Sequence, residues 1–414
     1  LDADGALWTD FLALCDFGGR LAGSPSEAQA QAWCTTRLDA VSPGVRSRQD
    51  ATPYAGWTCH RAELFDANSG ARLAAVPLLG TASTPADGLE LDVIDLGRGT
   101  PEQIRQAGDA VRGRAVLVAH EYPFASVTVH RRVKLAAAQE AGAAAFLIAQ
   151  PEAGVGPVSG SSGRGGGAGI PAMGISAEAA AVLRRPGARV RMHLAGEDRP
   201  GLETKALVLD LPGRGPERVV VSAHIDGHPL AESAIDNGTG VAAALALARA
   251  AAPFMQGMER GLTVCIFSAE EWALQGSRAW IAGLDAESRA RIRLNLNLDS
   301  LAGSDRLTAL TSGFPALGAF LQEAATAGGH ALATHLPLMP NSDHANFAAA
   351  GIPALRLLAG FDEPESKLRL LLTPADTRAL VEQGTMRDAT RCAGALLWAA
   401  LGARSEELAA LARR

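Results

Sequence analysis

The most informative part of the sequence is SAHIDGHPLAESAIDNGTG, residues 222–240. It continues an apolar run at 219–221 and ends in a glycine-containing turn before an alanine-rich segment. His224, Asp226 and Asp236 therefore come after an apolar run that is typical of a buried strand. Charged groups are costly to bury unless another charge or an ion compensates them. This stretch predicts that something compensates these three side chains.

Length and composition narrow the class of protein. A chain of 414 residues is too long for one ordinary hydrophobic core, so we expect two domains. A net charge of −6 and the lack of a basic stripe argue against a nucleic-acid partner. Polar residues interrupt the long alanine-rich segments, which argues against a membrane span. The five scattered cysteines indicate neither a zinc–thiolate site nor a disulfide framework, which favours a cytoplasmic location, with a removed leader left open.

Apolar runs alternate with helical patterns from residue 204 onward. The runs are ALVLDL (206–211), RVVVSAH (218–224), LTVCIFSAEE (262–271), RLNLNLD (293–299) and ALRLLAG (354–360). This alternation predicts an α/β fold with a mainly parallel central sheet flanked by helices. A second strand–helix–strand pattern at 113–150 lies in a smaller, β-rich α/β insert. We therefore expect residues 1–57 and 201–414 to form one domain and residues 58–200 to form the insert.

Ionisable residues follow three of these predicted strands. They are His224 and Asp226, then Glu270 and Glu271, then Asp299, with Asp236 in the turn after the first strand. Each has an ordinary structural explanation, since Asp236, for example, could cap the next helix. Their joint position where α/β sheets bind ligands favours a metal site instead. Imidazole and carboxylate donors together point to zinc ahead of magnesium.

These motifs resemble a known family. AHID, AIDNGTG, SAEEWALQGS, NLD and NSDHANFAAAGIPAL occur in the order seen in the co-catalytic zinc aminopeptidases, a family that also includes glutamate carboxypeptidase, glutaminyl cyclases and the non-catalytic transferrin receptor. GRAVLVAHEYPF (113–124) and GIPAMGIS (169–176) resemble a protease-associated domain, which is commonly inserted in these enzymes. The resemblance covers nearly the whole chain and implies a zinc-exopeptidase fold with this domain as the insert.

The resemblance also implies roles for the site residues. His224, Asp236 and Asp299 would hold one zinc, and Asp236 would bridge to a second ion held by Glu271. Asp226 would orient His224 by accepting its other ring N–H.

Two further roles follow from the same resemblance. Glu270 would be the general base that moves a proton from water to the leaving amine. His344, within NSDH, would contact the substrate or the transition state.

One position departs from the family pattern. The family's last ligand is a histidine directly before a TPxDT motif, and the corresponding residue in LRLLLTPADT (368–377) is Leu372. Leucine cannot coordinate a metal, so one zinc is expected and the second ion is left open. His228 and His344 are candidate substitute ligands, although His228 could equally be an ordinary loop histidine.

The predicted function is a zinc-dependent hydrolase that cleaves an amide bond in a peptide or in a small N-acyl or amino-acid-derived compound. One alternative is a catalytically silent binding protein with the same fold. Another is a single-zinc acyl-transfer or cyclisation enzyme. The sequence leaves substrate identity and oligomeric state open, although the insert could contribute an interface between copies.

Overall fold

The computed structural model describes residues 5–413, which form two compact units. The main unit comprises Leu1–Tyr54, Glu203–Leu371 and Asp376–Arg414, and the insert unit comprises Ala55–Leu202 and Leu372–Ala375. The chain passes between the units within strands β1 (Arg48–Asp66) and β7 (Arg189–Leu211). The sequence predicts boundaries at 57/58 and 200/201, which also fall within these two strands.

Residues 372–375 belong to the insert unit, whereas the sequence prediction placed them in the main one. The Leu372 side chain packs against the apolar cluster of the insert, which includes Leu78, Val118 and Ile148. Its carbonyl accepts a hydrogen bond from the backbone N–H of Ser159 at 2.7 Å. The correction therefore follows from tertiary packing, which the sequence motif around Leu372 does not reveal.

Helices and strands alternate along the main unit. Its α-helices are α1 (Ala6–Asp16), α2 (Pro25–Asp39), α6 (Thr239–Ala251), α7 (Gln275–Gly283), α8 (Ala286–Arg291), α9 (Pro315–Ala327), α10 (His344–Ala349), α11 (Gln383–Gly402) and α12 (Ser405–Leu411). Besides its parts of β1 and β7, its strands are β8 (Arg218–His224), β9 (Gly261–Phe267), β10 (Ile292–Leu298), β11 (Leu307–Leu310), β12 (Ala333–His335) and β13 (Ala354–Ala359). Shorter helical turns are η2 (Ala234–Gly238), η3 (Ala252–Gly257), η4 (Lys367–Leu370) and η5 (Arg378–Leu380).

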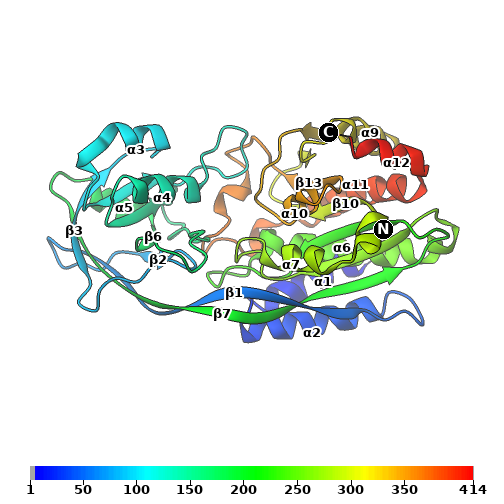
Figure 1. Cartoon of the computed structure of the whole chain (residues 1–414), viewed down its shortest axis with the longest axis horizontal. Helices are drawn as coiled ribbons and strands as arrows, with labels where there is room; N and C mark the ends of the chain where they lie inside the picture. Colours follow the sequence, from blue (N-terminus) through cyan, green and yellow to red (C-terminus); the bar gives the residue numbers. More distant parts are fainter. Residues whose placement is uncertain (1–4, 414) are drawn as a thin grey trace. The chain divides into compact units, whose positions relative to one another are not determined.

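One mixed, mainly parallel sheet forms the centre of the main unit (Figure 1), in the strand order β12-β11-β13-β10-β8-β9-β7. Strand β8 pairs in parallel with β9 on one side and with β10 on the other, and β10 pairs in parallel with β13. The pairs β7–β9 and β11–β13 are antiparallel. Helices α6 and α11 contact β8 and β10, while α10 contacts β10 and β13. The predicted α/β fold with a mainly parallel sheet flanked by helices is confirmed.

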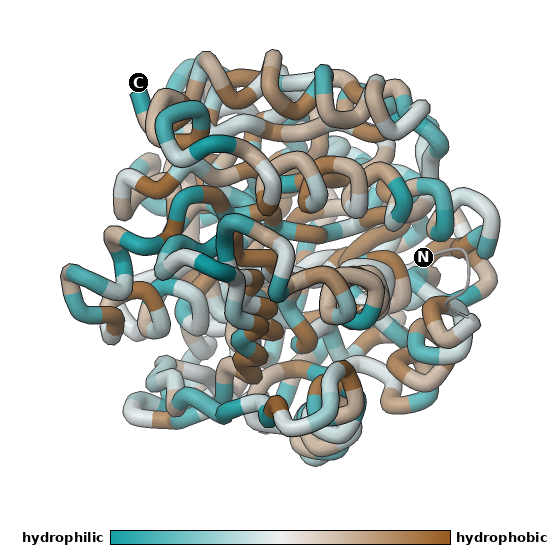
Figure 2. Tube along the Cα trace, turned by 90° about the vertical axis from the view of Figure 1, so that its right-hand side faces the viewer, coloured by the Kyte–Doolittle hydropathy of each residue, from teal (hydrophilic) through white to brown (hydrophobic). Residues whose placement is uncertain are grey.

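Helix α6 is the central helix of this unit. It contacts strands β8, β9 and β10 and helices α1 and α11, and most of its side chains are buried. The stretch Ala234–Gly257 is long and apolar enough to cross a membrane, yet 72% of its most apolar window is buried inside the protein. Figure 2 shows brown, hydrophobic segments stacked in the middle of the view. Core packing therefore accounts for the apolar composition of α6.

The insert unit is a smaller α/β unit. Strands β3, β4, β5 and β6 pair in parallel in that order, β2 pairs antiparallel with β6, and β3 pairs antiparallel with β7. The elements are β2 (Ala75–Pro77), β3 (Leu89–Asp95), α3 (Pro101–Ala107), η1 (Gly108–Ala110), β4 (Ala115–Ala119), α4 (Arg131–Glu140), β5 (Ala145–Ala149), β6 (Ala172–Ile175) and α5 (Ala177–Leu183). The strand–helix–strand pattern predicted at 113–150 corresponds to β4, α4 and β5.

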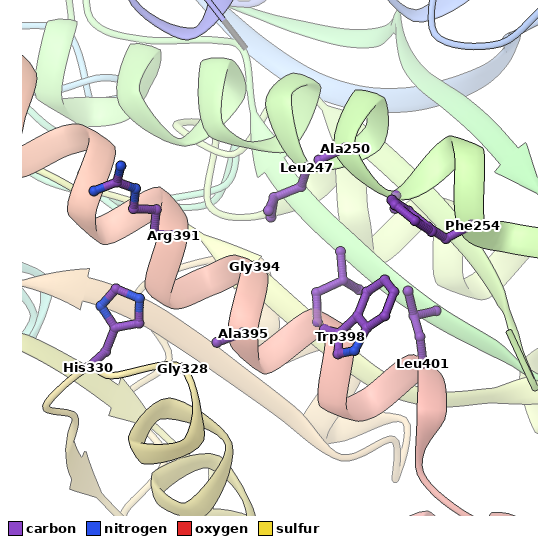
Figure 3. A pocket seen from close by; sticks show the side chains of 12 residues that line it. Leu247, Ala250, Phe254, Gly328, His330, Arg391, Gly394, Ala395, Trp398 and Leu401 are labelled. Atoms are coloured by element: carbon purple, nitrogen blue, oxygen red, sulfur yellow. The ribbon is translucent and has the colours of Figure 1, made fainter. Parts of the chain in front are cut away.

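A groove of about 400 Å³ lies in the main unit between α6 and α11 (Figure 3). The rings of Phe254 and Trp398 line it and meet edge to face with their centroids 5.4 Å apart. Arg391 and His330 lie at the other end. None of the residues predicted for the metal site lines this groove, so it is a separate feature of the surface.

Candidate active site

Three neighbouring strands bring the predicted site residues to one edge of the main sheet. Strand β8 ends at His224, which pairs in register with Phe267, the last residue of β9. Strand β10 ends at Leu298, one residue before Asp299. Because these strands run parallel, their carboxyl ends meet at the same edge, where open α/β sheets bind ligands.

The histidine and two of the aspartates form one compact group. His224 Nε2 lies 3.2 Å from Asp236 Oδ1 and 3.7 Å from Asp299 Oδ2. One ligand atom from each of the three residues lies within 4.8 Å of the others. The side chains of His224 and Asp299 are at most 2% exposed, and that of Asp236 is 16% exposed. The structure therefore brings together the three residues that the sequence assigned to the first metal.

Asp299 is held in its ionised form by its neighbours. Arg356 Nη2 lies 3.0 Å from Asp299 Oδ1, and both side chains are almost fully buried. The hydroxyl of Ser342 donates a hydrogen bond to Asp299 Oδ2. Burial opposes ionisation, but the Arg356 charge and these hydrogen bonds hold the pKa of Asp299 well below its usual value. Asp299 therefore offers a carboxylate to the cluster.

The turn that carries Asp236 is fixed through its backbone. The N–H groups of Ile235 and Asp236 donate to the two carboxyl oxygens of Asp376, at 2.8 and 3.3 Å. The side chain of Asn237 donates to Leu298 O at 2.9 Å, which ties the turn to the end of β10. Asp376 belongs to the TPADT motif, and the sequence alone predicts no role for it. Its function here is to position Asp236.

Asp226 connects the first two strand ends. Its Oδ1 accepts the N–H of Glu270 at 3.2 Å, and its Oδ2 accepts the N–H of Glu271 at 3.1 Å. His224 Nδ1 lies 2.9 Å from the backbone oxygen of Asp226 and 3.6 Å from its Oδ1. The nearer acceptor for the ring N–H is thus the carbonyl, while the carboxylate positions the two glutamates.

The two glutamates have different surroundings. Both are buried, with 9% of Glu270 and 7% of Glu271 exposed. Burial raises the pKa of Glu270 well above its usual value, and the nearby charge of His224 opposes that rise. Glu271 Oε2 lies 2.6 Å from His228 Nε2. One glutamate therefore sits beside the cluster, while the other is paired with a second histidine.

Arg20 supports the site although the sequence predicts no role for it. Its guanidinium is fully buried and donates to the carbonyls of Leu14, Gly18, Ile225, Glu232 and Ser233 at 2.8 to 3.0 Å. The last three carbonyls belong to the loop that leads from His224 to the turn of Asp236. Arg20 therefore holds this loop against the link between α1 and α2. No local pattern in the sequence shows this role, because three of the five partners lie more than 200 residues away along the chain.

Glu27 supports the other side of the site. This buried carboxylate on α2 accepts hydrogen bonds from the Gly23 N–H, the Gln31 amide and the hydroxyls of Thr204 and Ser268. Ser268 lies two residues before Glu270, between β9 and the glutamate pair. Glu27 therefore fixes the segment that carries Glu270 and Glu271. The helical sequence pattern around Glu27 does not indicate this role.

His344 begins helix α10, and its imidazole is fully buried. Burial, together with the charge of Arg356, lowers the pKa of His344 to about 3, so the ring is neutral. The expectation that His344 contacts a substrate stays a prediction, and a ring without exposed surface lends it no support.

The donor set fits a divalent metal ion. One imidazole and two carboxylates are ligand types that zinc uses, and they are buried with ligand atoms close together. Burial opposes protonation of His224, but the surrounding carboxylates still raise its pKa well above its ordinary value. Several carboxylates therefore surround this imidazole, and a cation would provide the compensation that the sequence predicts.

Comparison with known proteins identifies a peptidase family and an inserted domain. Residues 206–397 match Peptidase family M28, and residues 75–183 match the PA domain. Aminopeptidase YwaD of Bacillus subtilis is 24% identical over 365 residues, which are 87% of this chain and 76% of that protein.

Solved structures share the fold. A Peptidase M28 precursor from Shewanella amazonensis superposes with a TM-score of 0.81 at 20% identity, covering 97% of this chain and 94% of that one. A zinc aminopeptidase from Bacillus subtilis superposes with a TM-score of 0.76 at 20% identity, covering 96% and 94%. The resemblance found in the sequence is therefore confirmed: residues 206–397 match a peptidase family, and residues 75–183, in the insert, match the PA domain.

Proposed function

We propose that the chain is a zinc-dependent amide hydrolase in which His224, Asp236 and Asp299 hold the metal and Glu270 is the general base. The match of residues 206–397 to a peptidase family supports a peptide hydrolase, and the finer assignment is the proposal. The observation that carries it is the buried group of one imidazole and two carboxylates beside a positioned glutamate. The binding-protein alternative predicts the loss of several of these groups, and all of them are present.

Zinc bound at this cluster would act as a Lewis acid that polarises a carbonyl and lowers the pKa of water. His224 and Asp299 supply ligands from the ends of β8 and β10, and Asp236 supplies one from the intervening turn. The hydrogen bonds of the Asp376 and Arg20 side chains to backbone groups keep that turn and its loop in place. The ligands are therefore positioned by backbone contacts before any ion arrives.

Glu270 moves the proton in this proposal. Its carboxylate would accept a proton from the attacking water and pass it to the departing amine, which is general acid–base catalysis. Asp226 fixes the backbone of Glu270, and Glu27 fixes Ser268 just before it. The low exposure of Glu270 also keeps bulk water from competing for that proton.

The substrate class is proposed from the relatives. The B. subtilis relatives are named aminopeptidases, which supports a peptide with a free amino terminus as the first substrate to test. Small N-acyl or amino-acid-derived amides are the second class.

The test compares wild type with Glu270→Gln, both loaded with zinc, on amino-acid p-nitroanilides, free peptides and N-acyl amino acids. We expect Glu270→Gln to lower kcat about 10²- to 10⁴-fold, the range for a lost general base, without changing the zinc content. Glu323→Gln, on the exposed face of α9, is the control and should behave as wild type. The proposal fails if no amide is cleaved by the zinc-loaded chain, or if Glu270→Gln retains full activity.

A further inference from the structure

Strand β10 carries buried amides that the proposed chemistry does not use. In RLNLNLD (293–299), leucines alternate with Asn295, Asn297 and Asp299. Because alternate residues of a strand point to the same side, the two asparagines share one face of the sheet, and Asp299 follows one residue after the strand ends. Both asparagine side chains are fully buried. A strand buried on both faces is usually apolar throughout, so these amides need a specific explanation.

The neighbouring strand β8 adds a hydroxyl to the two amides. Ser222 pairs in register with Asn297 and is also fully buried. Nδ2 of Asn295 donates to Ser222 Oγ at 2.9 Å, and the Ser222 hydroxyl donates to Asn297 Oδ1 at 2.7 Å. These hydrogen bonds join the two strands two residues before His224 on β8 and two residues before Asp299 on β10.

The same series of hydrogen bonds continues to a proposed zinc ligand. Asn297 Nδ2 donates to Ser342 Oγ at 2.8 Å, and the Ser342 hydroxyl donates to Asp299 Oδ2. That carboxylate oxygen lies 3.7 Å from His224 Nε2, within the metal cluster. We call Asn295, Ser222, Asn297 and Ser342 the amide–hydroxyl row. It leads without interruption from the interior of the sheet to Asp299.

We propose that Asn297 is a positioning residue for the metal ligand Asp299 and acts through the hydroxyl of Ser342. The amide–hydroxyl row directs the Ser342 proton to Asp299 Oδ2 and so fixes the rotation of that carboxylate. This inference rests on the proposed function, because the proposed function assigns Asp299 to the zinc ion. It extends the site to residues inside the sheet that are not themselves proposed ligands.

The direction of the row is set at its inner end. Asn295 Nδ2 lies 3.4 Å from the backbone oxygen of Val220 as well as 2.9 Å from Ser222 Oγ. A carbonyl oxygen only accepts hydrogen bonds, so the amide presents its NH₂ group on this side. Ser222 accepts one of these protons and gives its own single proton to Asn297 Oδ1. The NH₂ group of Asn297 is therefore the one that meets Ser342.

The outer end of the row then has one arrangement. A serine hydroxyl has a single proton and rotates to suit its neighbours. Because Asn297 donates to the Ser342 oxygen, the Ser342 proton goes to Asp299 Oδ2. The other oxygen, Asp299 Oδ1, accepts the Ser300 hydroxyl at 3.0 Å and pairs with Arg356 at 3.0 Å. Both carboxylate oxygens thus have fixed partners, which hold the carboxylate in place for an ion.

The row also has a cost for the fold. Asn295 Oδ1 is buried and has no hydrogen-bond partner among the residues that the structure describes, 5–413. A buried acceptor without a partner is unfavourable, whereas an aliphatic side chain at this position of the strand would avoid the penalty. Stability of the sheet alone therefore does not explain these amides, which favours a role at the site.

The test measures the zinc affinity of the metal-free full chain by competition with a chromogenic chelator. Asn297→Val removes both hydrogen bonds of the amide. We expect it to weaken the tightest zinc binding about 10- to 100-fold, the range for a lost hydrogen-bond partner of a ligand. Asn346→Val is the matched control and should bind zinc as wild type does. The Asn346 amide also donates to a serine hydroxyl, Ser277 Oγ at 2.7 Å, and to a carbonyl, Leu274 O at 2.9 Å.

A double-mutant cycle separates positioning from a general loss of structure. Ser342→Ala removes the link between Asn297 and Asp299 and should weaken zinc binding by a similar factor. In that background Asn297→Val should cause little further loss, because its effect passes through the Ser342 hydroxyl. Ser342→Thr keeps a hydroxyl and should keep most of the affinity. Equal losses from Asn297→Val in the two backgrounds would show a general structural effect and overturn the inference.

Ser222→Ala is a smaller change that serves if Asn297→Val does not fold. It removes the proton that Asn297 Oδ1 accepts, so we expect weaker zinc binding, with a smaller loss than in Asn297→Val. Wild-type zinc affinity in Asn297→Val, or in Ser222→Ala where the first variant does not fold, would overturn the inference. If the chain nevertheless shows zinc-dependent hydrolysis that requires Glu270, the proposed function stands without it. If the wild-type chain binds no zinc, both fail.

Discussion

The two units of this protein carry almost the same short motif at the end of a parallel strand. AHID at 223–226 closes β8 in the main unit, and AHEY at 119–122 closes β4 in the insert unit. Each places a histidine directly after or at the last residue of the strand, with an acid close behind it. The motif alone therefore does not distinguish a metal site from an ordinary strand end.

The surroundings of the two motifs differ in charge. In the insert, Glu121 is paired with Lys134 at 2.6 Å and with Arg98 at 2.8 Å, so its charge is balanced. Burial, with Arg131 and Lys134 nearby, lowers the pKa of His120 to about 3.

In the main unit, His224 instead meets the carboxylates of Asp236 and Asp299. The comparison teaches that the neighbouring elements, more than the motif, determine whether an ion is needed.

The largest expected effect on stability concerns the ion pair between Lys134 and Glu121 in the insert. Lys134 is fully buried and also donates to the carbonyls of Arg98 and Ala119. Lys134→Met leaves Glu121 without this partner, so we expect the insert to lose about 3 kcal/mol of its free energy of unfolding. The measurement is hydrogen–deuterium exchange of the β4 and β5 segments under increasing urea, with zinc content recorded in parallel.

The matched control for that change is Arg105→Met, which removes an exposed ion pair with Glu102 on α3. Exposed pairs contribute little, so exchange in this control should match wild type. Two results would contradict the account that an ion pair balances AHEY while AHID needs a metal ion. They are unchanged exchange in Lys134→Met and a loss of zinc from the main unit.

A smaller effect is the pH dependence that His120 gives to the insert. Its folded-state pKa is about 3, whereas an unfolded histidine has a pKa near 6.5. The unfolded state therefore binds more protons between these values, and the free energy of unfolding falls as the pH decreases from about 6.5. His120→Gln should reduce that slope by about 1 kcal/mol per pH unit or less.

The slope is best measured between pH 6.5 and 5, where His120 contributes and most carboxyl groups have not begun to titrate. Identical slopes for wild type and His120→Gln would show that the charge environment of AHEY is not the one described here.

The sequence predicted the strands that build the site because their apolar runs end abruptly in ionisable residues. It therefore located His224, Asp236 and Asp299, which the structure brings together. Strand β7 is longer than the predicted run ALVLDL (206–211), because it extends from Arg189 to Leu211, and its long partner β1 contains Pro53. In the structure β1 pairs only with β7 among the described strands, and proline is tolerated at such an edge.

The supporting residues were beyond the reach of the sequence for a different reason. Arg20, Glu27 and Asp376 act through backbone groups that are distant along the chain, so no local pattern shows their partners. The placement of Leu372 with the insert likewise depends on packing between distant segments.

The central claim is that the charged groups around each motif decide whether it binds a metal ion. By this claim AHID contributes to a metal site, whereas AHEY does not. The most direct measurement is calorimetric titration of zinc into the metal-free full chain, for His224→Ala and for His120→Ala. We predict that His224→Ala loses the tightest binding event, because one ligand of the cluster is removed, and that His120→Ala binds as wild type does. Tight zinc binding that survives in His224→Ala, or that disappears in His120→Ala, would contradict the account.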